Sequence, residues 1–187
     1  MKFLDGARQY LAVFHPDAST RKIYLVDPST GEIETVTLQD PVDSVSGPED
    51  GSFLVAFHHD LGDSGGPGMR VIRMSVSPTS GRYTHRIATY SLTRELSDYA
   101  FTSGGSALIG ALVQDPIAFV LDLATGEYQA LELPRDPVAA GMVPGTTWSW
   151  FQHAHPLGSL TLVPLDAFTR SEGVLVEGFM MDGLLDL

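Results

Sequence analysis

The sequence has 187 residues, of which 43% are hydrophobic and 18% are charged. This composition predicts one globular domain over residues 1–187 and excludes a disordered or fibrous chain. Its 23 acidic and 11 basic residues give a formal net charge of −12, which argues against nucleic acid as a partner because phosphate contacts require Lys and Arg. The chain contains no cysteine, so disulfides and thiolate metal ligands are excluded.

The apolar segments are short. No apolar run approaches the 18 residues of a membrane-spanning helix, and residues 1–6 lack the uninterrupted apolar stretch of a signal peptide. We therefore expect no membrane span and a cytoplasmic location, unless the chain is a fragment of an exported protein. Only two lysines and no asparagine occur. Because the codons of both residues are AT-rich, this usage indicates a GC-rich bacterial genome.

Four repeats of roughly 40–50 residues follow one another along the chain, a period typical of propeller blades. Each opens with a turn that leads into an apolar strand, followed by a second strand and a third, more alternating one. The predicted strands are 9–14, 22–27 and 33–38, then 53–59, 69–76 and 83–92, then 107–113, 117–122 and 128–133, and finally 148–153, 159–164 and 174–179. A further short segment follows each third strand, beginning at Gln39, Arg94, Arg135 and Met181. Each repeat is therefore a four-stranded antiparallel meander.

Two of the turns share the sequence Asp-x-x-Thr-Gly-Glu, beginning at Asp27 and at Asp122. The glycine of such a turn supplies a positive φ angle between two strands. These turns therefore predict tight hairpins.

The pattern of repeats resembles β-propeller repeat proteins over nearly the whole chain. The resemblance implies an all-β fold of propeller-type blades, about four antiparallel meanders, and it selects no subfamily because the Trp-Asp signature of WD repeats is absent. The alternative is a β-sandwich with irregular hairpins. Four blades could form a small closed ring, with residues 181–187 pairing with the first repeat. They could also be part of a larger propeller, or half of a ring shared with a second copy.

The segment Gly62–Pro67, with Asp63, Ser64 and Gly65 at its centre, is similar to the nucleophile loop of chymotrypsin-like serine proteases. That chemistry needs a His base and an orienting Asp, which in that family precede the Ser by long stretches of chain. Only 63 residues precede Ser64 here, so no such triad can be assembled. We expect a Gly-rich loop shaped for backbone reasons and no catalytic residue.

Histidines gather where the apolar strand that opens each repeat ends, and acidic residues accompany them. The candidate ligand-binding residues are His15, Asp17, His58, His59, Asp60, Asp115, His153 and His155. The loops that enter the following repeat carry the acidic residues Asp40, Glu95, Asp136 and Asp182, expected at the channel mouth. In a propeller these two sets of loops share a face. Imidazole and carboxylate groups suit a divalent cation, although histidines and aspartates at strand ends also cap backbone. We expect no cofactor beyond this possible cation.

Aromatic residues crowd one predicted strand at Trp148, Trp150 and Phe151. At a period of two, the tryptophans share one face of the strand and Phe151 occupies the other. All three are core residues if both faces pack against neighbouring blades. On an unpaired end blade they form an apolar patch for a partner, and residues 179–181 raise the same question.

These features predict a non-catalytic β-propeller binding module that presents an acidic, His-containing loop face to a protein or small ligand. No phosphate-binding loop or dinucleotide fingerprint appears. The expected partner is another protein, or a second copy that associates through the end blades. The alternative function is a metal-dependent propeller hydrolase or lyase that uses the His and Asp residues of the same face.

Overall fold

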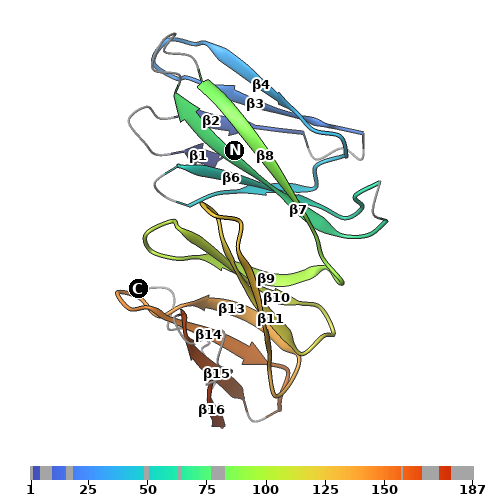
Figure 1. Cartoon of the computed structure of the whole chain (residues 1–187), viewed down its shortest axis with the longest axis vertical. Coiled ribbons are helices and arrows are strands. Elements are labelled where there is room, and N and C mark those ends of the chain that lie inside the picture. Colours follow the sequence, from blue (N-terminus) through green and yellow to red (C-terminus); the bar gives the residue numbers. More distant parts are fainter. Residues whose placement is uncertain are drawn as a thin grey trace. The chain divides into compact units, whose positions relative to one another are not determined.

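The computed structural model describes residues 2–4, 10–15, 19–48, 51–62, 65–76, 83–156, 158–165 and 173–177. Within these residues the chain forms sixteen strands in four antiparallel sheets (Figure 1). The strands of each sheet are neighbours in chain order, so each sheet is a simple meander. The chain divides into two compact parts, an N-terminal half of residues 1–93 and a C-terminal half of residues 94–187.

The N-terminal half contains two sheets. Sheet 1 consists of β1 (Lys2–Leu4), β2 (Tyr10–Val13), β3 (Lys22–Val26) and β4 (Ile33–Thr37). Sheet 2 consists of β5 (Ser44–Ser46), β6 (Phe53–His58), β7 (Gly68–Val76) and β8 (Tyr83–Ser91).

The C-terminal half repeats this plan. Sheet 3 consists of β9 (Leu96–Phe101), β10 (Ala107–Leu112), β11 (Ile117–Asp122) and β12 (Tyr128–Glu132). Sheet 4 consists of β13 (Pro137–Met142), β14 (Trp148–His153), β15 (Ser159–Pro164) and β16 (Val174–Glu177). Among the described residues, no helix is long and apolar enough to cross a membrane.

The four-stranded meanders predicted from the sequence are confirmed. All twelve predicted strands are present, and their ends differ from the prediction by at most two residues. The further strand expected after each third strand is present as β5, β9 and β13. The segment beginning at Met181 lies outside the described residues.

The core of the N-terminal half lies between sheets 1 and 2. Alternate residues of β3 and β6 point into it: Ile23 and Leu25 from β3 and Leu54 and Ala56 from β6, and all four are fully buried. A period of two places such residues on one face of a strand. Burying them removes apolar surface from water at about 25 cal/mol per Å², which holds the two sheets together.

An equivalent core lies between sheets 3 and 4. Ile109 and Ala118 of sheet 3 pack there with Phe151 and Val163 of sheet 4. The core of each half is therefore built from the facing surfaces of two consecutive sheets.

The aromatic residues of β14 separate into two groups. Phe151 points into the core and Trp150 is also buried, whereas Trp148 is 37% exposed. The ring of Trp150 covers Gly141 so closely that a Cβ atom at this glycine would lie 2.3 Å from it. Two of the three aromatics are thus core residues and Trp148 is not; residues 179–181 lie outside the described residues.

The two Asp-x-x-Thr-Gly-Glu turns have the same geometry. The Oδ1 atom of Asp27 accepts hydrogen bonds from the backbone N–H groups of residues 29 and 30, and that of Asp122 accepts them from residues 124 and 125. Gly31 and Gly126 have φ angles of 73° and 78°. The expected positive φ is confirmed at both turns. The pKa of Asp27 is lowered by the hydroxyl of Ser29 and then by its backbone N–H, and the pKa of Asp122 is lowered chiefly by the backbone N–H of Thr125.

Candidate functional site

Two sets of loops meet at the same end of the sheets in each half. In the N-terminal half, the loop between β4 and β5 contacts the loop between β6 and β7, where the N–H of Gly62 donates to Oδ1 of Asp40 at 3.2 Å. In the C-terminal half, the N–H of Val113 donates to the carbonyl of Glu95 at 2.8 Å. The two sets of loops are therefore in contact within each half.

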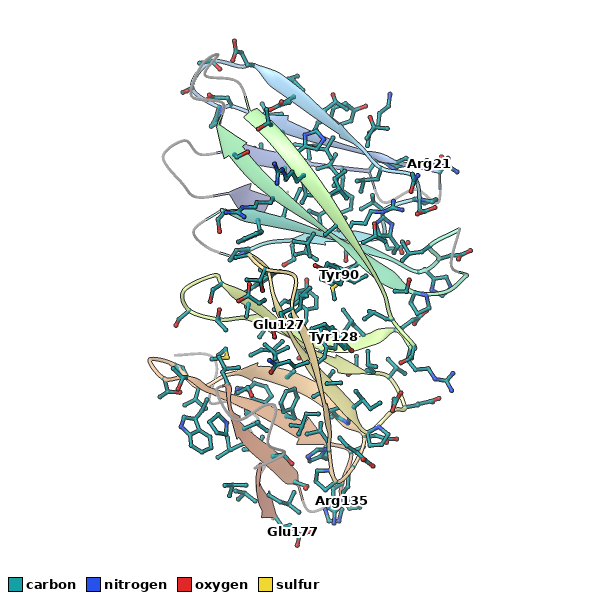
Figure 2. The ribbon with its side chains drawn as sticks, in the orientation of Figure 1. Arg21, Tyr90, Glu127, Tyr128, Arg135 and Glu177 are labelled. Carbon is teal, nitrogen blue, oxygen red and sulfur yellow. The ribbon has the colours of Figure 1, made fainter. Side chains whose placement is uncertain are left out.

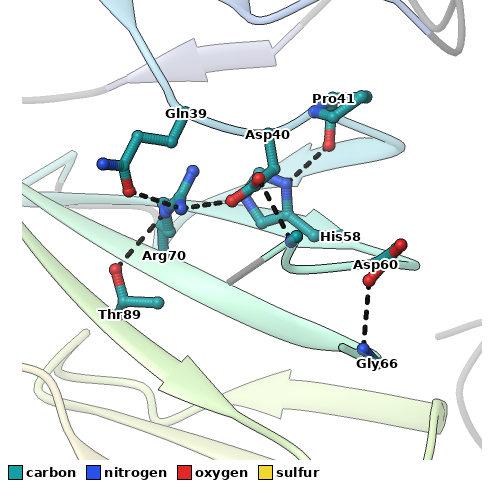
Figure 3. A network of polar contacts seen from close by, with 9 residues as sticks. Gln39, Asp40, Pro41, His58, Asp60, Gly66, Arg70 and Thr89 are labelled. Carbon is teal, nitrogen blue, oxygen red and sulfur yellow. Dashed lines mark hydrogen bonds and ion pairs between the residues drawn. The ribbon is translucent and has the colours of Figure 1, made fainter. Parts of the chain in front are cut away.

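The centre of the N-terminal site is an ion pair between Asp40 and Arg70. Arg70 lies on the core-facing side of β7, and its side chain is 5% exposed, against 14% for Asp40. Its Nε donates to Oγ1 of Thr89 and its Nη2 to Oε1 of Gln39, both at 3.3 Å (Figure 3). The carboxylate of Asp40 is thus neutralised by a buried cation.

His58 ends β6 and is buried beside this ion pair. Its Nδ1 lies 2.6 Å from the carbonyl oxygen of Pro41, which can only accept, so Nδ1 carries the proton. Nε2 is buried and has no hydrogen-bond partner among the described residues. Burial lowers the pKa of His58; the carbonyl of Pro41 opposes this, and the charge of Arg70 lowers the pKa further. The imidazole is therefore neutral at pH 7.

Asp60 stabilises its own loop. Its Oδ1 accepts a hydrogen bond from the N–H of Gly66 at 3.0 Å (Figure 3). Gly65 and Gly66 have φ angles of 61° and 135°, in the region that favours glycine. These glycines are thus required by the backbone, as the sequence indicated, while Ser64 lies outside the described residues.

The C-terminal half has a related but different site around His153, which ends β14 and is buried. Its Nε2 lies 2.7 Å from Oγ1 of Thr161. Burial lowers the pKa of His153, the carbonyls of Arg135 and Asp136 oppose this, and the charge of Arg135 lowers the pKa further. Arg135 itself is paired with Glu177 at 2.9 Å (Figure 2). These two side chains are 36% and 60% exposed, so the pair contributes little stability.

The remaining candidates are distributed around these two centres. His15, His59, Glu95 and Asp136 are exposed, and Asp115 and His155 are half-buried. The N–H of His59 donates to the carboxylate of Asp43. Asp17 and Asp182 lie outside the described residues. Within the described ranges, no group of three or more His, Asp or Glu side chains is placed to hold a metal ion, and the cation of the sequence analysis stays a prediction.

Sequence reasoning missed Arg70 and Thr161. The signal for Arg70 is its place in β7, because a period of two puts it on the same face as the buried Ile72. An arginine on the apolar face of a strand needs a carboxylate or amide partner. That requirement points to the acidic loop at Asp40.

Comparison with known proteins identifies the fold of the chain. No family model and no curated protein matches the sequence. Among solved structures, it is similar to the β-propeller domain of Myceliophteria thermophila Cps50 (Swd1), with a TM-score of 0.58 and 11% identity over 88% of this chain and 53% of that one. It is also similar to the RRP9 WD40 repeats, with a TM-score of 0.53 and 13% identity over 93% of this chain and 53% of that one.

The chain has a β-propeller-type fold. A third similar structure is Kuenenia stuttgartiensis hydrazine synthase, with a TM-score of 0.56 and 12% identity over 89% of this chain and 46% of that one. The chain spans about half of the length of these three structures. The sheets are the blades of the propeller, and the two loop sets described above lie at one end of the blades in each half.

The negative charge of the propeller chain is uneven. The N-terminal half has 11 acidic and 8 basic residues, a net charge of −3, whereas the C-terminal half has 12 acidic and 3 basic residues, a net charge of −9. A field of one sign attracts partners of the opposite sign. Sheets 3 and 4 are therefore the more strongly acidic pair of blades.

Proposed function

We propose that this chain is a non-catalytic β-propeller binding module, whose acidic loop ends dock onto a basic surface of a partner protein. The observation that carries the proposal is the state of the candidate catalytic groups. Asp40 is held by Arg70, Nδ1 of His58 by the carbonyl of Pro41, and Asp60 by its own loop. A general base or metal ligand must offer a free, accessible lone pair, so these contacts favour a structural role.

Carboxylates are among the candidate groups that remain accessible, together with the exposed His15 and His59. Glu95 and Asp136 are exposed at the loop ends of the C-terminal half, which carries the net charge of −9. Exposed charges of one sign steer a partner of opposite charge and contribute specificity more than affinity. The same charge disfavours nucleic acid.

A capture experiment with matched charge reversals tests the proposal. The wild-type chain is compared with a Glu95→Lys/Asp136→Lys variant and with a control, Glu32→Lys/Glu127→Lys. The control changes the net charge by the same amount. Its two residues lie in the turns that precede β4 and β12, whereas the loop ends follow these strands. We expect partner proteins to be retained by wild type and control, lost from the loop-end variant, and released at 1 M salt, where the Debye length is about 3 Å.

Two results would overturn the proposal. Equal retention by the loop-end variant and the control would show that the loop ends are not the binding surface. Metal analysis of the purified chain is the second check, because stoichiometric Ca, Mn or Zn that is lost on chelation would favour the metal-dependent hydrolase or lyase.

A further inference from the structure

Sheet 2 departs from the acidic character of the chain. Its four strands contain no aspartate or glutamate, whereas each of the other three sheets contains at least one. The same strands carry three arginines, Arg70, Arg73 and Arg86. Arg70 is buried and is neutralised by Asp40. The other two arginines give this sheet a positive charge that the acidic residues of its own strands cannot balance.

Arg73 and Arg86 lie directly opposite each other on the neighbouring strands β7 and β8 (Figure 1). Residues paired in this way point to the same face of a sheet, with their Cβ atoms about 4.5–5.5 Å apart. Both side chains are exposed, and within the described part of the chain neither has an ion-pair or hydrogen-bond partner. Because like charges at opposite positions destabilise a sheet, this arrangement lowers stability unless an anion binds to it.

The neighbours of this pair orient one guanidinium and add polar groups. Arg73 lies opposite Phe53 of β6, with its Cζ atom 6.0 Å from the centre of the ring. The ring face attracts the guanidinium, whose N–H groups remain available for hydrogen bonds. Two positions further along the same face, Ser75 and Thr84 are also opposite each other, and their hydroxyl oxygens are 2.8 Å apart. The face therefore carries two guanidinium groups beside two hydroxyls, which are groups that bind phosphate oxygens.

We propose that Arg73 and Arg86 together bind a phosphate monoester group, carried by a phosphorylated side chain of a partner protein or by a small phosphorylated molecule. A monoester has a charge of about −1.5 to −2 at pH 7 and three strong acceptor oxygens, so it can neutralise both guanidinium groups. A carboxylate has a single charge and is matched by one arginine. This site is distinct from the acidic loop ends of the C-terminal half, and its ligand has the opposite charge.

Titrations of the full chain with three probes test this inference. The probes are acetyl-Gly-phosphoserine-Gly-amide, the same peptide with glutamate in place of phosphoserine, and inorganic phosphate. The NMR signals of the arginine Nε–H groups report binding at each arginine. We expect the phosphopeptide to shift the signals of Arg73 and Arg86. It should bind about tenfold or more tightly than the glutamate peptide, because it forms charged hydrogen bonds with two arginines instead of one.

Inorganic phosphate distinguishes the two sources of the ligand. It should shift the same two signals, because it offers the same oxygens. A phosphopeptide that binds more tightly than inorganic phosphate identifies a phosphorylated partner protein, whereas equal affinity identifies a small phosphorylated molecule. Thermal unfolding is a second measurement, since a ligand that binds only the folded chain stabilises it. Phosphate should therefore raise the unfolding temperature of the wild type.

Three matched variants locate the site. Arg73→Gln and Arg86→Gln should each reduce the affinity for the phosphopeptide about tenfold or more, and phosphate should no longer raise their unfolding temperature. Arg21→Gln is the control, because it removes the same charge from an exposed arginine that precedes β3. We expect this control to bind like the wild type.

Two results would overturn the inference. Equal affinity for the phosphopeptide and the glutamate peptide would show that the pair does not select a phosphate group. An equal loss of affinity in Arg21→Gln and Arg86→Gln would show that binding follows the overall charge of the chain. Neither titration involves Glu95 or Asp136, so the loop-end capture experiment is decided independently.

Discussion

The two halves of the chain use the same strand order and register but treat the space between their sheets differently. In the N-terminal half, Arg70 extends from β7 to Asp40 and Gln39 and links the strand to the loop. In the C-terminal half, the shorter side chain of Thr161 contacts only the imidazole of His153 through its hydroxyl, and Thr161 also borders a pocket. The difference arises from side chains at matched positions, since the backbone frame is shared.

Some features of the blades are shared by both halves, and others differ between them. Both halves keep a buried histidine at the end of a second strand and an Asp-x-x-Thr-Gly-Glu turn. These features satisfy backbone groups, which must be paired when buried. The residue between the sheets does not have to pair with backbone, so one half has an ion pair there and the other has a pocket.

The largest expected effect comes from removing Asp40. Asp40→Ala leaves the guanidinium of Arg70 buried without its carboxylate, and breaking a buried pair in this way costs about 3–5 kcal/mol of unfolding free energy. Asp136→Ala, at an exposed carboxylate of the other half, should change stability by less than about 0.5 kcal/mol. Urea unfolding measures both.

The double variant Asp40→Ala/Arg70→Met sharpens this prediction. Replacing both charges by apolar groups is often neutral or stabilising, so the double variant should recover most of the loss. A double variant as unstable as Asp40→Ala would show that the loss does not come from the unpaired arginine.

A smaller and equal effect is expected at the two matched turns. Gly31→Ala and Gly126→Ala each place a side chain at a positive φ angle, which costs about 1–2 kcal/mol. Gly104→Ala is the control, because a Cβ there meets open space and its φ angle is not in this region. Thermal unfolding should show similar losses for the first two variants. A loss at only one turn would contradict the equivalence of the halves.

The smallest effect is a dependence of stability on pH. Burial holds the pKa of His58 and His153 below the ordinary value, so the unfolded chain binds protons more readily than the folded one. Stability should therefore be complete above pH about 6.5 and fall as the pH drops below it. Urea unfolding between pH 7.5 and 5.5 should show this decline.

His58→Gln and His153→Gln should each reduce the decline. We expect the larger reduction from His58→Gln, because the guanidinium near it is buried while that of Arg135 is partly exposed and screened. A decline that is unchanged in both variants would assign the pH dependence to other groups.

Much of the fold could be predicted from the sequence, because its signals are local. Alternation of apolar residues located the strands, and the Asp-x-x-Thr-Gly-Glu turns located two hairpins with their positive φ angles. Strand period and turn chemistry act over a few residues. For the same reason the glycines of the loop at Gly65 and Gly66 could be assigned to backbone geometry.

The roles of the charged residues were decided by the tertiary structure alone. From the sequence, Asp40 and His58 were candidates for ligand binding, but neutralisation by Arg70 depends on a residue 30 positions away that folding brings to the same end of the sheet. Whether Trp148 is exposed and whether Thr161 borders a pocket likewise depend on the neighbouring strands and sheets. Periodicity assigns a side chain to a face, whereas its charge state and burial are set by the distant groups that pack against that face.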